Sequence, residues 1–177
     1  ILRQRHPDIF KEVLERLPGG TSSKRRHELP VETGPFEKGL FASSELMSDA
    51  LFALYEAGLI KRPADDDDDA CIHAGFLIGS NNFYAKLHAL SEEQRRRIRM
   101  TSISNVNTVY GDEHRKRRQR KLPSFVNETM MVTLLGAAVS DALDDGRVVS
   151  GVGGQFDFVS MAHALDDAQS ILMLRAT

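Results

Sequence analysis

Residues 150–159 read SGVGGQFDFV, a glycine-rich loop that leads directly into an apolar helical pattern. Two valines precede it at positions 148 and 149, so the segment predicts the order strand, loop, helix. Glycines let backbone N–H groups come close to a ligand, and the helix that follows directs its positive end to the same place. The loop is therefore expected to hold a nucleotide phosphate or a reacting oxyanion, or to be a tight structural turn.

The spacing within this loop does not fit the two common nucleotide-binding motifs. Gly151 and Gly153 match the first glycines of a dinucleotide fingerprint, but Phe156 occupies the place of its third small residue. No Lys-Ser or Lys-Thr pair follows, which excludes a P-loop. A structural turn and a loop that faces an oxyanion or a thioester remain as alternatives.

The rest of the chain alternates predicted strands and helices. Apolar runs predict strands at 70–79, 125–139, 147–151 and 170–177, and an alternating run predicts a strand followed by a loop at 100–110. Amphipathic patterns predict helices at 7–17, 48–58, 81–90 and 156–167, and a short one from 91. This alternation predicts an α/β fold, layered, with a largely parallel sheet flanked by helices. We expect residues 1–177 to form a single but incomplete α/β domain.

Composition and charge restrict the class of protein. The chain has 177 residues, 41% hydrophobic and 27% charged, and a net charge of −2, which gives no field that would attract nucleic acid or an acidic membrane. One cysteine, Cys71, excludes an intrachain disulfide framework and suits a reducing cytoplasm. No apolar run approaches the ~20 residues of a membrane span. The first residues, ILRQRHPD, lack a signal-peptide pattern and an initial Met, which predicts a piece of a longer chain.

Three further features are expected to be structural. The acidic run at 65–69 lacks the spaced ligands of a metal site and is expected to be a solvated turn. The basic run at 114–121 has no interleaved aromatic residues, so a solvated turn is favoured, with contact to an acidic partner surface as the alternative. Cys71 and His73 share one face of a strand, and without a second ligand pair nearby they are interpreted as core residues.

Glu45 is the most informative acidic residue. It precedes the predicted helix at 48–58, in the stretch FASSELMSDALFALYEAG. Its small neighbours leave the carboxylate approachable, whereas most glutamates in such a place are caps or surface residues. Taken alone, the residue leaves both a functional and a capping interpretation open.

Three stretches, in this order, resemble the acetyl-CoA hydrolase/CoA-transferase family in its C-terminal catalytic half. SELMSDALFALYEAGLI (44–60) is similar to the family's Ser/Thr-Glu-Met-x-Ser-Asp-Gly segment and the Leu-x-Glu-Ala-Gly helix after it. FLIGSNNFYAKL (76–87) is similar to its Phe-x-Leu-Gly-Ser segment, and SGVGGQFDFVSMAHAL (150–165) to its Ser-Gly-x-Gly-Gly-x-x-Asp-Phe loop and helix. The resemblance runs from residue 39 to the end and implies a CoA-transferase-like fold, with this chain a fragment of the C-terminal catalytic domain.

The resemblance also implies a reaction. The family glutamate that matches Glu45 attacks the acyl-CoA thioester and forms an acyl-glutamyl anhydride. A glutamyl-CoA thioester follows, which passes CoA to a carboxylate or to water. The residue type suits this role, because a glutamate is ionised at neutral pH and needs no separate base to attack. Asn105, in the pair Ser104–Asn105, matches an asparagine after the family's middle strand and is expected to have a polar catalytic role.

The same resemblance implies a role for the glycine loop. The backbone N–H groups of Gly153 and Gly154 are expected to hold the oxyanion that develops on the thioester, and one such donor contributes about 3 kcal/mol in comparable sites. Gly151 and Gln155 are expected to bind substrate and CoA in the same loop. Ser43 stands where the family often has histidine.

These observations predict a cytoplasmic acyl-CoA hydrolase or CoA-transferase, with acetyl-CoA as the expected acyl-CoA. CoA is a substrate, and neither a bound cofactor nor a metal is expected. The expected partners are the acyl-CoA, a small carboxylate and the N-terminal half of the parent enzyme, with a homo-oligomer as an open alternative; nucleic acid and membranes are not expected. The alternative function is a non-catalytic α/β module that binds CoA or a nucleotide. A nicotinamide-dependent enzyme would require an acidic ribose contact after the next strand.

Overall fold

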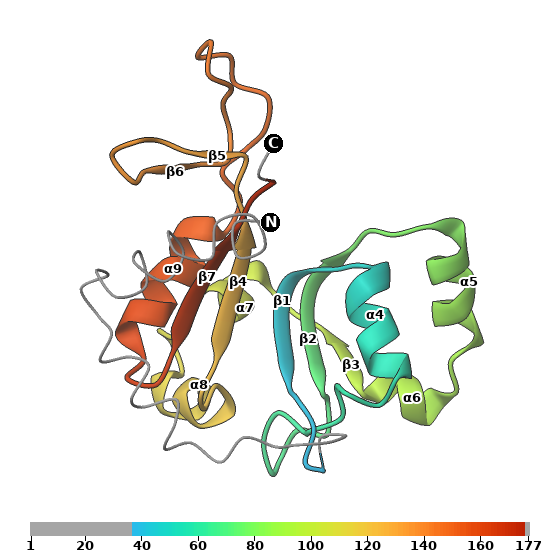
Figure 1. The fold of residues 1–177 in the computed structure, drawn as a ribbon. Helices are drawn as coiled ribbons and strands as arrows, with labels where there is room; N and C mark the ends of the chain where they lie inside the picture. The colour runs from blue at the N-terminus through green and yellow to red at the C-terminus, as the bar shows by residue number, and fades with distance from the viewer. Residues whose placement is uncertain (1–36, 176–177) are drawn as a thin grey trace, which may run out of the picture. The chain divides into compact units, whose positions relative to one another are not determined.

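The computed structural model describes residues 37–175, so the predicted helix at 7–17 and nearly all of the loop at 18–38 lie outside the described residues. The chain divides into two units after Glu37, and all described helices and strands belong to the second unit, Lys38–Thr177. Within this unit the prediction of an α/β fold with parallel sheets is confirmed (Figure 1). The prediction of one domain over 1–177 stays a prediction.

The first sheet has three parallel strands in the order β1-β2-β3. They are β1 (Ala42–Met47), β2 (Ile72–Leu77) and β3 (Ile98–Met100). In the register, Ala42 pairs with Ile72, and Ile72 pairs in turn with Ile98. Parallel strands need crossover connections, and helices provide them here. The carboxyl ends of the three strands therefore lie at one edge of the sheet.

Serine residues start the helices that accompany this sheet. The helices are α4 (Asp49–Glu56), α5 (Asn81–Ala89) and α6 (Glu92–Arg96), which follow Ser48, Ser80 and Ser91. The Ser80 hydroxyl accepts a hydrogen bond from the Phe83 N–H, and Ser91 forms a capping box with Gln94. Both contacts satisfy backbone donors that a helix N-terminus leaves free. The helices predicted from 48, 81 and 91 are confirmed.

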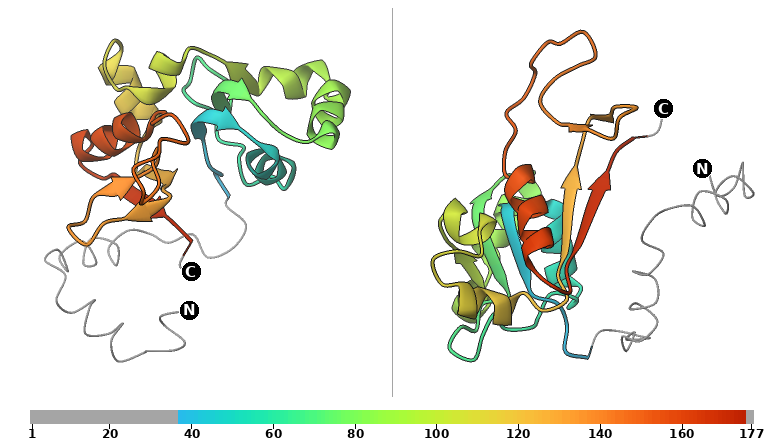
Figure 2. Two further views of the ribbon diagram at one scale, coloured as in Figure 1. Left: turned by 90° about the horizontal axis from the view of Figure 1, so that it is seen from above. Right: turned by 90° about the vertical axis from the view of Figure 1, so that its left-hand side faces the viewer.

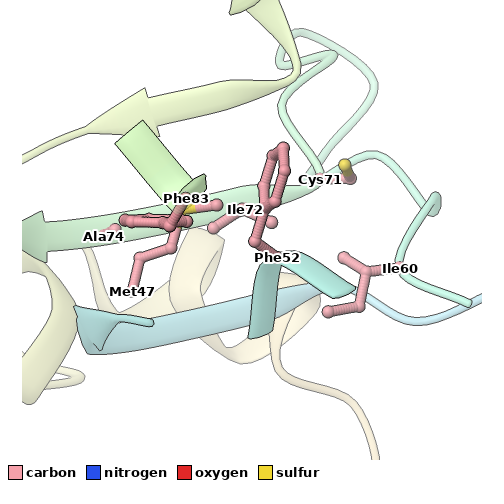
Figure 3. Close-up of a cluster of buried hydrophobic side chains, with 7 residues drawn as sticks. All are labelled: Met47, Phe52, Ile60, Cys71, Ile72, Ala74 and Phe83. Atoms are coloured by element: carbon pink, nitrogen blue, oxygen red, sulfur yellow. The ribbon is translucent and has the colours of Figure 1, made fainter. Parts of the chain in front are cut away.

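A cluster of buried apolar side chains holds α4 and α5 against one face of the sheet. Its members are Met47, Phe52, Ile60, Cys71, Ile72, Ala74 and Phe83 (Figure 3). The rings of Phe52 and Phe83 meet edge to face with their centroids 5.6 Å apart. Burying such side chains is the main source of stability, at about 1.5–3 kcal/mol for each large one. Cys71, which is fully buried, is confirmed as a core residue.

A second pair of parallel strands carries its own helix. β4 (Ser124–Glu128) pairs with β7 (Gln169–Met173), and α9 (Gln155–Ala164) packs on both strands (Figure 2). Its buried core consists of Val109, Phe125, Met161, Ala162 and Leu165. The helix predicted at 156–167 and the last strand are confirmed. A short antiparallel hairpin, β5 (Met131–Val132) and β6 (Ala138–Val139), follows β4.

Two short helices lie between these parts in the sequence. α7 (Ile103–Asn107) packs against β1, β2 and α9, and α8 (Glu113–Gln119) follows it. α7 therefore connects the first sheet with the helix that follows the glycine loop. Within residues 37–175 no helix is both long enough and apolar enough to cross a membrane.

Several predicted elements are wrong. The strand and loop predicted at 100–110 are the end of β3 followed by the helix α7, and the solvated turn favoured for 114–121 contains most of α8. The strand predicted at 125–139 is divided into β4 and the hairpin. At 147–151 the structure has only an isolated bridge, between Val148 and Ala142. Strand β1, which carries Glu45, is absent from the predicted elements.

Candidate active site

Glu45 lies on β1, near the carboxyl end of the strand. On either side of it, Ser44 pairs with Ala74 and Leu46 with Phe76, which sets Glu45 beside Gly75 of β2. Glu45 precedes the helix α4, as expected, and pairing with β2 holds its backbone in a strand that the sequence pattern does not predict. Side chains at the carboxyl ends of parallel strands are where α/β proteins place their binding sites.

Gly75 allows α7 to lie very close to the sheet. A Cβ atom at this position would overlap Cδ1 of Ile103 on α7 and would come within 2.9 Å of the Glu45 carbonyl oxygen. Only a residue without a side chain fits between the strand and the helix. The close approach brings the end of α7 to the edge where Glu45 stands.

Asn107, the last residue of α7, contacts Glu45 directly. Its Nδ2 donates a hydrogen bond of 2.8 Å to Oε2 of Glu45, across 62 positions of the chain. The side chain is buried, with 6% of its surface exposed, and its Oδ1 is buried without a hydrogen-bond donor among the described residues. A buried acceptor without a partner costs about 1–3 kcal/mol, so stability alone does not explain this asparagine.

Gly154 completes the group from the other side. A Cβ atom there would overlap both Oε2 of Glu45 and Nδ2 of Asn107, and would come within 3.1 Å of Asn107 Cγ. Gly154 is also the N-cap residue of α9. The Glu45 carboxylate therefore lies against the start of a ten-residue helix, where unpaired backbone N–H groups and the helix dipole favour negative charge.

The remaining predicted residues of the loop are Gly151, Gly153 and Gln155. Gly153 has a φ of +55°, a left-handed conformation that favours glycine. Gly151 has open space where a side chain would be. The side chain of Gln155 accepts a hydrogen bond from the hydroxyl of Ser140. Their roles in binding substrate and CoA stay predictions.

The asparagine beside Glu45 is Asn107, two residues after the predicted Asn105. The backbone carbonyl of Asn105 accepts a hydrogen bond of 2.8 Å from Nη2 of Arg120. In a helix, residues two positions apart point about 200° apart, so only one of the two asparagines can face Glu45. The sequence signal for Asn107 is the motif Asn-x-Asn itself, but the pattern of the segment predicts a strand, in which both side chains would share a face.

Two aspartates of the acidic run are built into the structure, which corrects the expectation of a solvated turn. Asp68 is 2% exposed; its Oδ2 lies 2.9 Å from Nε2 of the buried His73 and its Oδ1 lies 3.0 Å from Nη2 of Arg99. Asp65 forms ion pairs with Arg115 and Arg118 of α8. In the part of the chain that the structure describes, no three His, Cys, Asp or Glu side chains gather to hold a metal ion.

Two surface hollows lie elsewhere on the molecule. One, of about 480 Å³, is lined by residues that include Tyr55, Lys61 and Arg97; the other, of about 470 Å³, lies beside Asp67 and Arg99. Neither contains Glu45 or Asn107. The candidate site lies instead at the contacts of Glu45, where a carboxylate meets a buried amide donor and the start of α9.

The arrangement has the parts that acyl transfer requires. A carboxylate oxygen such as that of Glu45 can act as a nucleophile, the amide of Asn107 is a neutral donor, and the start of α9 offers backbone N–H groups. The three come from β1, α7 and α9, three elements that are distant in sequence. The site therefore depends on the fold, which brings these three elements together, and not on a single sequence motif.

Comparisons with known proteins agree with this fold. The family model of the acetyl-CoA hydrolase/transferase C-terminal domain matches residues 79–177, more than half of the chain. A solved structure of a point mutant of RipA has the same fold, with a TM-score of 0.62 and 23% identity over 77% of this chain. The chain spans 29% of the length of that protein. A search of curated proteins found no match.

The family match includes Asn105, Asn107 and the glycine loop, whereas Glu45 lies before it in the sequence. The fold brings Glu45 to the matched part through the hydrogen bond with Asn107. The chain belongs to the acetyl-CoA hydrolase/transferase family, of which it contains the C-terminal domain.

Proposed function

We propose that this chain carries the nucleophile of an acyl-CoA hydrolase or CoA-transferase, with acetyl-CoA as the expected donor. The observation that supports it best is the contact of Glu45 with both Asn107 and Gly154. A glutamate used only as a surface cap would need neither a buried amide donor nor a glycine that leaves room at its carboxylate. The family match supports CoA thioesters as substrates.

In the proposed first step, an oxygen of the Glu45 carboxylate attacks the thioester carbon. A C–O bond forms, the C–S bond breaks, and CoA leaves as a thiolate, so that an acyl-glutamyl anhydride remains. The thiolate then attacks the glutamyl carbonyl and releases the acyl group as a carboxylate. Glu45 now carries CoA as a thioester. Splitting one difficult transfer into two such steps is the advantage of covalent catalysis.

In the second half of the proposed reaction, the acceptor determines whether CoA is transferred or the thioester is hydrolysed. A small carboxylate that attacks the glutamyl thioester forms a new anhydride, and the released thiolate converts it to a new acyl-CoA and free Glu45. Water in the same place hydrolyses the thioester and releases CoA. The acyl-CoA and the carboxylate are the proposed small-molecule partners, and CoA is a substrate and not a resident cofactor. The N-terminal half of the parent enzyme and a second copy of the chain are proposed macromolecular partners.

Each attack creates an oxyanion that needs donors. In the proposal, backbone N–H groups of Gly153 and Gly154 serve one oxyanion, and the amide of Asn107 orients the Glu45 carboxylate. Gly151 and Gln155 contact the CoA portion, and Asn105 takes a supporting polar role. The start of α9 adds a favourable field for negative charge at the same place.

The test compares two glutamates in the full-length protein. Glu45→Gln keeps the shape of the side chain but removes the nucleophilic charge, so turnover should fall by at least about 1,000-fold. Glu56→Gln is the matched control, because Glu56 is an exposed residue of α4 that pairs with Lys86 among the described residues; its turnover should equal that of the wild type. Thermal unfolding checks that both variants are folded, and a panel of carboxylates identifies the acceptor.

Two outcomes would overturn the proposal. Full turnover of Glu45→Gln with any acyl-CoA would remove Glu45 from the chemistry. Binding of CoA without turnover by the wild-type protein, across all acyl-CoAs and acceptors, would favour the non-catalytic binding module.

A further inference from the structure

Arg120 is a buried cation at the end of α8. Only 7% of its surface is exposed, and burial lowers its pKa to about 10. Among the ion pairs of residues 37–175, none includes Arg120. Burying a charge without a counter-charge is costly unless many hydrogen bonds compensate. The sequence pattern predicts a solvated turn at this residue, so its burial requires an explanation.

The guanidinium of Arg120 donates to three backbone carbonyls at the end of α7. Its Nη2 lies 2.8 Å from the carbonyl oxygen of Asn105 and 3.2 Å from that of Val106. Its Nη1 lies 3.0 Å from the carbonyl oxygen of Thr108. The last carbonyls of a helix have no partner within the helix, and a cation satisfies them well. These three carbonyls flank Asn107 on both sides.

The same guanidinium also contacts the helix that begins at the glycine loop. Nη1 of Arg120 lies 2.9 Å from Sδ of Met161, a buried residue of α9. One side chain therefore contacts both α7, which ends in Asn107, and α9, which begins at Gly154. These two elements deliver the groups that surround the Glu45 carboxylate.

We propose that Arg120 is a positioning residue for the transfer reaction: it fixes the backbone around Asn107 and thereby holds the Asn107 amide against Glu45. This inference rests on the proposed function of Glu45. A planar guanidinium can donate several hydrogen bonds in fixed directions, whereas the ammonium of a lysine is a point donor on a flexible chain. Lysine at position 120 would keep the charge without keeping all three carbonyls in place.

The neighbouring arginines of α8 have different partners. Arg115 and Arg118 pair with Asp65, and Arg117 pairs with Glu113 and donates to the carbonyl of Ala164 at the far end of α9. Arg117 is therefore a matched control: it is an arginine on the same segment and also contacts α9. Within residues 37–175 its hydrogen bonds and ion pair go to Glu113 and Ala164 and not to α7.

The experiment uses the full-length protein with Arg120→Lys, Arg120→Met and Arg117→Met. A displacement of about 1 Å in a catalytic group can cost about 100-fold in rate, so kcat of both Arg120 variants should fall by about that factor. KM for acyl-CoA should change less than about twofold, because Arg120 touches no proposed CoA-binding group. Arg117→Met should keep the wild-type kcat and KM.

A double-mutant cycle with Asn107→Ala separates positioning from general stability. If Arg120 acts through Asn107, adding Arg120→Met to Asn107→Ala should lower kcat no further than Asn107→Ala alone. If the fold-losses in kcat of Arg120→Met and Asn107→Ala multiplied in the double variant, the two residues would act independently, which would contradict the inference. So would wild-type kcat per folded molecule in Arg120→Lys or Arg120→Met, even with a lower unfolding temperature, since that is the result of a purely structural role.

The two proposals fail in different ways. Full activity of Glu45→Gln would remove the proposed function itself. Loss of activity in Glu45→Gln together with normal kcat in Arg120→Lys would leave the function standing and overturn only the role of Arg120. If Arg120→Met does not fold, Arg120→Lys and its cycle with Asn107→Ala decide the matter.

Discussion

Gly154 and Glu45 approach each other so closely that no side chain fits at Gly154. The Cβ of an alanine there would overlap the Glu45 carboxylate and the Asn107 amide, although Gly154 and Glu45 are more than a hundred positions apart in sequence. The glycine is required by what it faces and not by its own backbone angles, since its φ is −92°. A contact of this kind links the glycine loop to the proposed nucleophile.

The first prediction follows from that contact. Gly154→Ala should reduce turnover by about 100-fold or more, because the methyl group displaces the carboxylate and its donor. The fold should survive, as judged by circular dichroism and thermal unfolding.

Gly146→Ala is the control for this change. Gly146 has a φ of +80° and open space around it, so alanine there should lower the free energy of unfolding by about 1 kcal/mol and leave turnover intact. Wild-type turnover of Gly154→Ala would show that the loop has only a structural role.

Gly75 gives a second prediction, about the packing of α7. Gly75→Ala should reduce both stability, by about 1–3 kcal/mol, and turnover, because the new methyl group overlaps Cδ1 of Ile103 and pushes α7 away. Adding Ile103→Val removes that Cδ1 atom and should restore part of both losses. Urea unfolding and steady-state kinetics measure the two effects. A double variant no better than Gly75→Ala would contradict this account of the close packing.

Asp68 should matter for stability, although it lies in a run of five similar residues. Asp68→Ala removes the partner of the buried His73 and the acceptor of the Ala70 N–H, so we expect a loss of about 3 kcal/mol in the free energy of unfolding. Asp67→Ala changes an exposed residue of the same run and should leave the unfolding midpoint unchanged. If Asp68→Ala and Asp67→Ala lowered the midpoint of denaturant unfolding equally, the acidic run would act only through its total charge.

His73 should make stability depend on pH. Burial lowers the pKa of this imidazole below its ordinary 6.5; the hydrogen bond and charge of Asp68 oppose the shift, and the charges of Arg99 and Arg120 add to it. Because the unfolded chain binds the proton at a higher pH than the folded one, this contribution to stability is constant above about pH 6.5 and decreases as the pH falls below it.

The measurement for His73 is urea unfolding between about pH 7.5 and pH 5. His73→Gln should be less stable than the wild type at neutral pH but should lose less stability on acidification. The same slope in both proteins, or a wild type that gains stability as the pH falls through this range, would contradict the assignment.

Local signals are sufficient to predict part of this fold. Serines precede α4, α5 and α6, and glycines precede α9. Ser80 and Ser91 cap their helices through contacts within three residues, and all four helices are predictable from the sequence. Strand β1 is not, because Ala42, Ser43 and Ser44 have no strand preference of their own. Their strand conformation comes from pairing with β2, which lies 30 positions further along the chain.

The candidate site is likewise only partly predictable from the sequence. Glu45 and the glycine loop are identifiable from motifs, but the choice between Asn105 and Asn107 depends on whether the segment is a helix. The burial of Arg120 could not be predicted, because a run of basic residues gives no sign of which one finds backbone carbonyls. The choice of asparagine and the burial of Arg120 both depend on contacts between distant parts of the chain.

In the proposed reaction Glu45 forms a covalent bond to CoA, and trapping the intermediate shows whether this bond exists. The full-length protein is incubated with acyl-CoA without acceptor, treated with borohydride and digested, and the peptides are analysed by mass spectrometry. We predict that the carboxyl group of Glu45 is converted to a primary alcohol, because borohydride reduces a thioester but leaves a free carboxylate unchanged. An unmodified Glu45 peptide from enzyme shown to be active, or reduction of another carboxylate in its place, would contradict the account.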